Sequence, residues 1–75
     1  MISELDLHGV RHPDVDRIVE NYVLMNTTPL NIITGRSDTM RFLVTKVLKR
    51  HSFTWDIPRH NAGMITVFVG EENAG

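Results

Sequence analysis

The 75-residue chain is predicted to fold as a two-layer α/β sandwich with the element order β-α-β-α-β-β. Short segments that end at Gly or Pro alternate apolar with polar residues, as strands do. Between them, two longer segments repeat apolar residues at helical spacing. Because each helix follows a strand, right-handed crossovers place both helices on one face of a mixed four-stranded sheet, and the other face stays open.

Four segments have the composition of strands. The first, residues 2–8, alternates leucines with polar residues and stops at Gly9. The others cover residues 30–34, 53–57 and 64–69, and the last is the richest in β-forming residues.

Two segments are predicted to be helices. The first opens at Pro13 and carries Asp14 and Asp16 in its first turn, where negative charge favours the helix dipole. The second is capped by Ser37 or Asp38. The apolar positions expected to face the sheet are Val15, Ile18, Val19, Tyr22 and Val23, then Met40, Leu43, Val44, Val47 and Leu48.

The length allows one domain, expected over residues 1–70, with residues 71–75 as a flexible tail. The absence of cysteine excludes disulfides and thiolate metal sites and fits a reducing compartment. No signal-peptide pattern is present, and no apolar run approaches the ~20 residues of a membrane span. We therefore expect a soluble, cytoplasmic monomer with no membrane partner.

Charge is distributed unevenly, although its net value is −1. Residues 1–35 carry five acidic and two basic side chains, whereas residues 36–75 carry six basic and four acidic ones. The low net charge argues against indiscriminate coating of nucleic acid. The basic half is suited to steering a polyanion to one face, but ordinary solvated charge on two helices explains the same counts.

Candidate site residues follow the strands at their carboxyl ends, where α/β sheets bind ligands. The first strand ends at His8 and the second at Gly35 and Arg36. If the third strand runs parallel to them, it delivers Arg59 and His60 to the same edge. The convergence of these three segments predicts a binding site.

Asp6 and His8 form the candidate catalytic pair. If the leucines of this strand face the helices, both polar side chains project from the open side with Cα atoms ~7 Å apart. A carboxylate at that distance holds an imidazole in one tautomer. Taken singly, each is better explained as an ordinary strand or turn residue, and the convergence of the three segments is what favours the catalytic interpretation.

The turn over residues 34–38 is the candidate phosphate-binding segment. Gly35 lets the backbone approach a ligand, and the N–H groups that open the following helix attract anions. Arg36 adds a bidentate phosphate contact, and Arg41 lies one turn into the helix. The turn is not a P-loop, because the downstream Gly-Lys-Ser/Thr is absent.

A metal site is not expected, although four histidines are present. Asp6 with His8, or His8 with His12, would supply ligands from a strand and its turn. No HExxH spacing or other closed ligand set appears.

The aromatic residues have two interpretations. Phe53, Trp55 and Phe68 are candidates for stacking on bases, but such residues more often belong to the core, and a small core needs them. An open sheet face bearing Met64, Thr66 and Phe68 would instead dock a protein partner.

Several segments, in order, carry a resemblance to a known family. They are Leu-Asp-Leu-His-Gly at residues 5–9, the helix at 13–23, Ile-Ile-Thr-Gly-Arg at 32–36, Met-Arg at 40–41 and Ala-Gly-Met-Ile-Thr-Val at 62–67. Together they resemble the small MutS-related (Smr) domain over nearly the whole chain.

The Smr resemblance implies the same β-α-β-α-β-β sandwich, similar to the C-terminal domain of translation initiation factor three. It also implies DNA-nicking or RNA-cleaving endonuclease activity, with Asp6 and His8 catalytic and Gly35 and Arg36 in a phosphate-facing loop. Ser37 departs from the family pattern. It stands where the family's second motif, which residues 32–36 resemble, has its second glycine.

The leading hypothesis is a phosphodiester endonuclease acting on RNA or DNA. His8, oriented by Asp6, acts as general base or acid, and His60 takes the opposite role. A divalent cation such as Mg²⁺, held by Asp6, is the one candidate cofactor. The residues expected to contact nucleic acid are Gly9, Arg11, Gly35, Arg36, Ser37, Arg41 and Arg59.

Two other functions are alternatives. One is a non-catalytic RNA- or DNA-binding module that uses the same edge, favoured by the low net charge and the altered second motif. The other is a protein-interaction domain of a larger complex. The intact Leu-Asp-Leu-His-Gly motif at residues 5–9 favours the enzyme.

Overall fold

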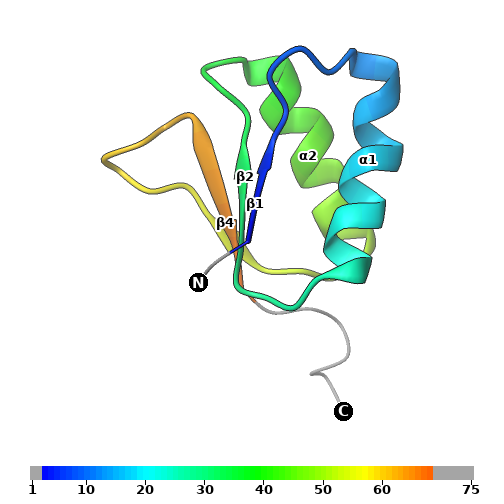
Figure 1. Ribbon diagram of the computed structural model, residues 1–75. Coiled ribbons are helices and arrows are strands. Elements are labelled where there is room, and N and C mark those ends of the chain that lie inside the picture. Colours follow the sequence, from blue (N-terminus) through cyan, green and yellow to red (C-terminus); the bar gives the residue numbers. More distant parts are fainter. Residues whose placement is uncertain (1–2, 69–75) are drawn as a thin grey trace.

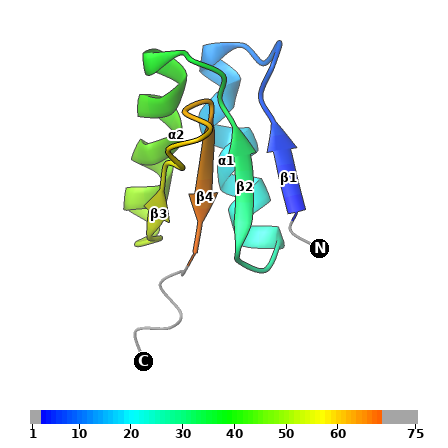
Figure 2. The same cartoon turned by 90° about the vertical axis from the view of Figure 1, so that its left-hand side faces the viewer.

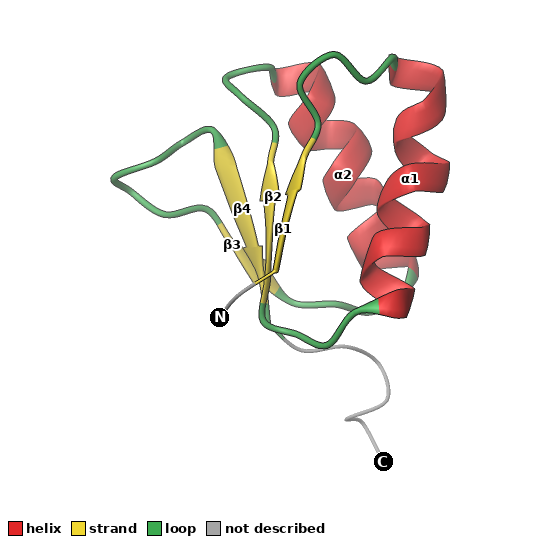
Figure 3. Ribbon diagram, in the orientation of Figure 1, coloured by secondary structure: helices red, strands yellow, loops and turns green. Residues whose placement is uncertain are grey.

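The computed structural model describes residues 3–68, which form two layers (Figure 1). Within these residues, both helices cover one face of the sheet and no helix covers the other (Figure 3). The element order is the predicted one: β1 (Ser3–Asp6), α1 (His12–Met25), β2 (Leu30–Ile33), α2 (Asp38–Arg50), β3 (Trp55–Asp56) and β4 (Met64–Val67). Ile2, Val69 and the expected tail lie outside the described residues.

The sheet is mixed, and its strand order is β1-β2-β4-β3 (Figure 2). β1 pairs with β2 in parallel, whereas β4 is antiparallel to both of its neighbours, β2 and β3. β3 therefore runs in the same direction as β1 and β2. Its carboxyl end points to the same edge of the sheet as theirs, which is the condition that the predicted convergence required.

The faces of the sheet follow the alternation of the sequence. Leu5 stands opposite Ile32 in β2, and Ile32 stands opposite Ile65 in β4, so these side chains line the helical layer. Glu4 and Asp6 are exposed on the other face, as expected. The buried apolar core consists of Leu7, Val15, Val19, Val23, Leu30, Ile32, Met40, Val44, Val47, Leu48, Phe53, Ile65 and Val67.

Each strand is shorter than predicted, and β3 most of all. The predicted segment 53–57 keeps only Trp55 and Asp56, because Phe53 N donates to Leu48 O (2.9 Å) and so completes the end of α2. Phe53 is buried and Trp55 packs on the core, whereas Phe68 is 45% exposed, so the core does not use it. β1 ends at Asp6 rather than His8, since the chain turns after Leu7.

The helix ends also refine the expectations. α1 begins at His12, one residue before Pro13, and Asp14 lies in its first turn. Ser37 rather than Asp38 caps α2, since its Oγ accepts a hydrogen bond from Met40 N (3.1 Å). Within residues 3–68, neither helix has the length and apolar character that crossing a membrane requires.

Asp16 does not belong to the first turn of α1 and instead links the two helices. Its Oδ1 lies 2.7 Å from a guanidinium nitrogen of Arg50 on α2. The hydrogen bond from Arg50 is the main reason that the pKa of Asp16 lies below its ordinary value. Beside this pair, His51 Nε2 lies 2.7 Å from Glu20 Oε2. These contacts link α1 and α2 across a partly exposed surface, where ion pairs contribute little to stability.

Two leucines on the helices test the packing. Leu48 is fully buried and Leu24 is 58% exposed. We expect Leu48→Ala to lower the free energy of unfolding by about 2–5 kcal/mol, because it leaves a cavity in the core. Leu24→Ala, the matched control, should change it by less than about 0.5 kcal/mol. Urea denaturation of both variants measures the difference, and equal losses would contradict the packing.

Candidate functional site

A pocket of about 380 Å³ lies where the carboxyl ends of β1 and β2 meet the β3–β4 loop, residues 57–63. His8 lies two residues beyond the end of β1, and β2 leads into Gly35 and Arg36. The loop contributes Arg59 and His60. The complete lining is His8, Ile33, Gly35, Arg36, Arg59, His60, Asn61, Ala62 and Gly63. The three segments that the sequence predicted to converge therefore do share one rim.

His8 and Asp6 form a close pair beside this pocket. Asp6 Oδ1 accepts a hydrogen bond from His8 N (2.9 Å) and lies 2.7 Å from His8 Nδ1. These bonds, the backbone one first and the imidazole one second, hold the pKa of Asp6 below its ordinary value. Asp6 therefore stays ionised at neutral pH and favours the tautomer with the proton on Nδ1.

The other nitrogen of His8 faces the turn that follows β2. A Cβ atom placed on Gly35 would lie 3.7 Å from His8 Nε2, so the imidazole edge sits directly over this glycine. Gly35 has a φ of +67°, which a residue with a side chain rarely adopts. With Nδ1 held by Asp6, Nε2 is the nitrogen available to a ligand in the pocket.

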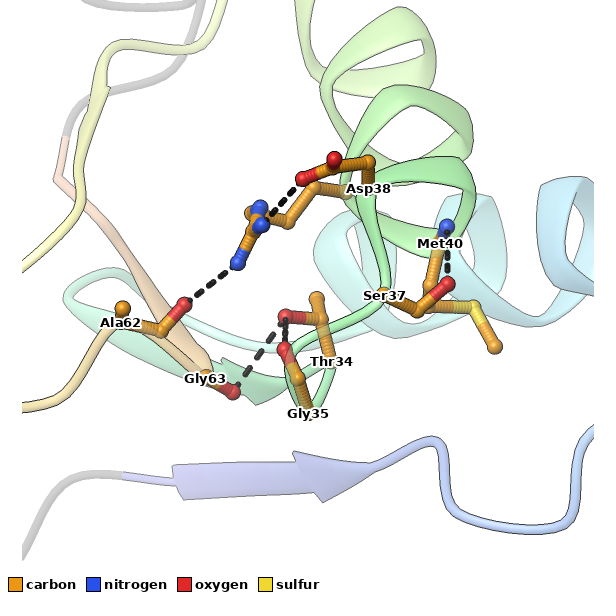
Figure 4. Close-up of polar contacts among 8 residues, drawn as sticks. Thr34, Gly35, Ser37, Asp38, Met40, Ala62 and Gly63 are labelled. Atoms are coloured by element: carbon orange, nitrogen blue, oxygen red, sulfur yellow. Dashed lines mark hydrogen bonds and ion pairs between the residues drawn. The ribbon is translucent and has the colours of Figure 1, made fainter.

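Hydrogen bonds join the β3–β4 loop to the end of β2, and Figure 4 draws the contact between Thr34 and Gly63. Gly63 O accepts from both Thr34 N (2.8 Å) and Gly35 N (3.0 Å), which joins the β3–β4 loop to the end of β2. Thr34 Oγ1, which is buried, also donates to Gly63 O (3.3 Å). A Cβ atom on Gly63 would lie 3.3 Å from Gly35 Cα, so the two glycines permit this close approach.

The lining of the pocket is cationic. Arg36 and Arg59 bring guanidinium groups, and His8 and His60 bring imidazoles. No aspartate or glutamate is among the lining residues, and the Asp6 carboxylate beside them pairs with His8. A phosphate group is the ligand whose charge and hydrogen-bond acceptors match such a lining.

Four predicted contact residues lie outside the lining. Gly9 is exposed in the turn after His8, and Arg11 lines a separate shallow hollow with the start of α1. Ser37 is occupied in capping α2. Arg41 donates to Ala62 O (2.8 Å) and pairs with Asp38, so its guanidinium group is engaged within the protein.

Asn61, Ala62 and Gly63 line the pocket although sequence reasoning did not assign them to it. Ala62 and Gly63 hold the site together through carbonyl oxygens, which every residue carries. A carbonyl contact leaves no mark on residue type, so the sequence held no signal for Ala62, whereas Gly63 is marked by the close approach to Gly35 that a glycine permits. Asn61 carried a weak signal in the sequence, because it is a polar residue in a loop that ends in glycine.

The donor groups at this rim do not fit a divalent cation. Magnesium prefers several oxygen ligands, carboxylates above all. The pocket lining contains no carboxylate, and Asp6 Oδ1 is taken by two hydrogen bonds from His8. In the described part of the chain, no three His, Asp or Glu side chains gather as a metal site would need.

Comparison of the chain with protein-family models, with curated proteins and with solved structures finds no match. Fold and rim define a class: a small α/β domain with a cationic pocket at the carboxyl edge of its sheet. The Smr resemblance stays a prediction carried by the motifs at residues 5–9 and 32–36.

The bond between His8 and Asp6 is open to direct measurement. His8→Ala removes the imidazole but keeps the backbone amide, which is the larger cause of the lowered pKa. We therefore expect the pKa of Asp6 to rise only part of the way to its ordinary value. Carboxyl ¹³C titration by NMR measures the shift. The pKa of Asp16, held by Arg50, serves as the control and should not move.

Proposed function

We propose that this domain binds a phosphodiester of RNA or DNA at the cationic pocket and cleaves it as an endonuclease. One observation carries the proposal. His8 has its Nδ1 held 2.7 Å from the Asp6 carboxylate and lines a pocket that it shares with two arginines and a second histidine. A carboxylate-oriented imidazole beside a phosphate-binding group is the arrangement that general acid–base catalysis requires.

In the proposed reaction, Arg36 and Arg59 bind the phosphate and stabilise the charge that develops on it. His8 Nε2 accepts the proton of the attacking hydroxyl or water as its oxygen forms the new bond to phosphorus. The bond to the leaving oxygen breaks, and that oxygen takes a proton from the protonated form of His60. Asp6 stabilises the imidazolium that His8 becomes.

Charge on the open sheet face supports a path along the rim. Glu4 and Asp6 from β1 and Asp56 from β3 are exposed, and by strand register they belong to this face. Carboxylates there repel a polyanion laid across the sheet. The cationic groups, by contrast, line the pocket at the rim, so we propose that the nucleic acid strand follows the rim. A monomer acting in the cytoplasm is part of the same proposal.

A second candidate is a non-catalytic nucleic-acid-binding module that uses the same pocket. The observation in its favour is that Arg36 and Arg59 line the pocket whether or not the histidines act on the substrate. Affinity without cleavage would favour this candidate. Absence of affinity for every nucleic acid would favour the protein-interaction domain, whose partner would then meet exposed residues such as Phe68.

His8→Ala tests the catalytic role. We expect it to lower kcat on labelled RNA or DNA by about 10²–10⁴-fold, since general acid–base groups contribute in this range. His12→Ala is the matched control, because His12 is exposed at the start of α1 and lies outside the pocket lining. Cleavage that continues at the wild-type rate in His8→Ala would refute the mechanism.

Arg36→Ala tests the phosphate contact and applies to both candidates. Loss of one phosphate contact should weaken binding uniformly across sequences and reduce the slope of log K against log salt by about one. Fluorescence anisotropy with short single-stranded oligonucleotides at several salt concentrations measures the slope. Lys49→Ala, on the exposed surface of α2, is the charge-matched control and should leave the slope unchanged.

A further inference from the structure

The β3–β4 loop brings Arg59 and His60 to the pocket, and its placement therefore decides the geometry of the site. The loop projects away from the helical layer, on the open side of the sheet (Figure 1). Arg59 and His60 are both exposed near its tip. Hydrogen bonds within the loop shape it: Asn61 N donates to Pro58 O (3.1 Å) and Gly63 N to Asn61 Oδ1 (3.1 Å). These internal bonds do not attach the loop to the rest of the molecule.

Two neighbouring carbonyl groups attach it. Gly63 O accepts from the backbone at the end of β2, which fixes the base of the loop. Ala62 O, one residue closer to His60, accepts from Arg41 Nη1 (2.8 Å). Arg41 belongs to the first turn of α2, so this bond links the loop to the helical layer.

The guanidinium group of Arg41 is itself held in place. Its second terminal nitrogen pairs with the Asp38 carboxylate one turn earlier on α2 (Figure 4). Only 22% of the Arg41 side chain is exposed, against 94% for Asp38. A planar guanidinium donates in two fixed directions at once, so one side chain connects the helix to the loop rigidly.

We propose that Arg41 is a positioning residue that holds the β3–β4 loop against α2 and so sets the place of His60 and Arg59 in the pocket. This role replaces the nucleic-acid contact that the sequence suggested for Arg41. Its consequence for catalysis rests on the proposed function, whereas its consequence for the loop does not. Lysine at this position offers a single ammonium group and cannot reproduce both directed bonds.

Amide hydrogen exchange measures the effect on the loop directly. We expect Arg41→Ala to speed exchange at Thr34, Gly35 and Met64 by about tenfold, because these amides donate to loop carbonyls and loss of the link lets the loop open locally. Arg41→Lys should give an intermediate rate. Arg50→Ala, an arginine at the opposite end of α2, is the matched control and should leave these amides unchanged.

Kinetics supply the second readout. We expect Arg41→Ala to lower kcat by about tenfold and to raise KM less, because displacement of His60 acts on the chemical step. Arg50→Ala should change neither constant. A purely structural role would lower the melting temperature without this division between kcat and KM.

The outcomes separate the two proposals. If Arg41→Ala folds and exchange at the three amides stays at the wild-type rate, the positioning role is refuted. If Arg41→Ala does not fold, the same exchange measurement is made on Arg41→Lys and Asp38→Ala. Exchange at the wild-type rate in both variants refutes the positioning role. If the wild-type protein cleaves neither RNA nor DNA, the proposed function fails, while the exchange rates still decide the role of Arg41.

Discussion

The site depends on one carbonyl group. Gly63 O receives the backbone N–H groups of Thr34 and Gly35, and this joint brings the β3–β4 loop to the ends of β1 and β2. Two glycines meet there at a distance that a side chain would not tolerate comfortably. The bonds are backbone to backbone and involve a buried threonine, so water competes poorly for them. This joint fixes the base of the loop that carries Arg59 and His60, and the bond from Arg41 to Ala62 O attaches the loop one residue closer to them.

Asp6 at the end of β1 and His8 just beyond it form a hydrogen-bonded pair, and that pair is local. Asp6 reaches both the amide and the imidazole of His8 because the chain turns just after Leu7. A strand followed by a turn is enough to build this geometry, and no distant element is involved. The second half of the pocket is different, since it comes from a loop more than fifty residues away along the chain.

Some charged residues hold the fold together and others line the pocket. A count of charged residues does not show which residue has which role. Arg41, Arg50 and Asp16 are occupied by partners within the domain, whereas Arg36 lines the pocket. The basic excess of residues 36–75 therefore overstates the charge offered to a ligand. The charge available to a ligand depends on which guanidinium groups at the rim are not bound by an acceptor within the domain. The packing of the chain decides this.

The sequence by itself determined the element order, the faces of the sheet and the Asp6–His8 pair, because period-two and helical spacing are local properties of the chain. It also indicated the convergence at the rim, on the condition that β3 ran parallel to β1. The tertiary structure alone decided that direction, through the insertion of β4 between β2 and β3. Only the tertiary structure showed that Arg41 binds Ala62 O and that Arg50 binds Asp16, because these contacts join residues distant in sequence. The first contact also ends on a backbone carbonyl, which any residue could supply.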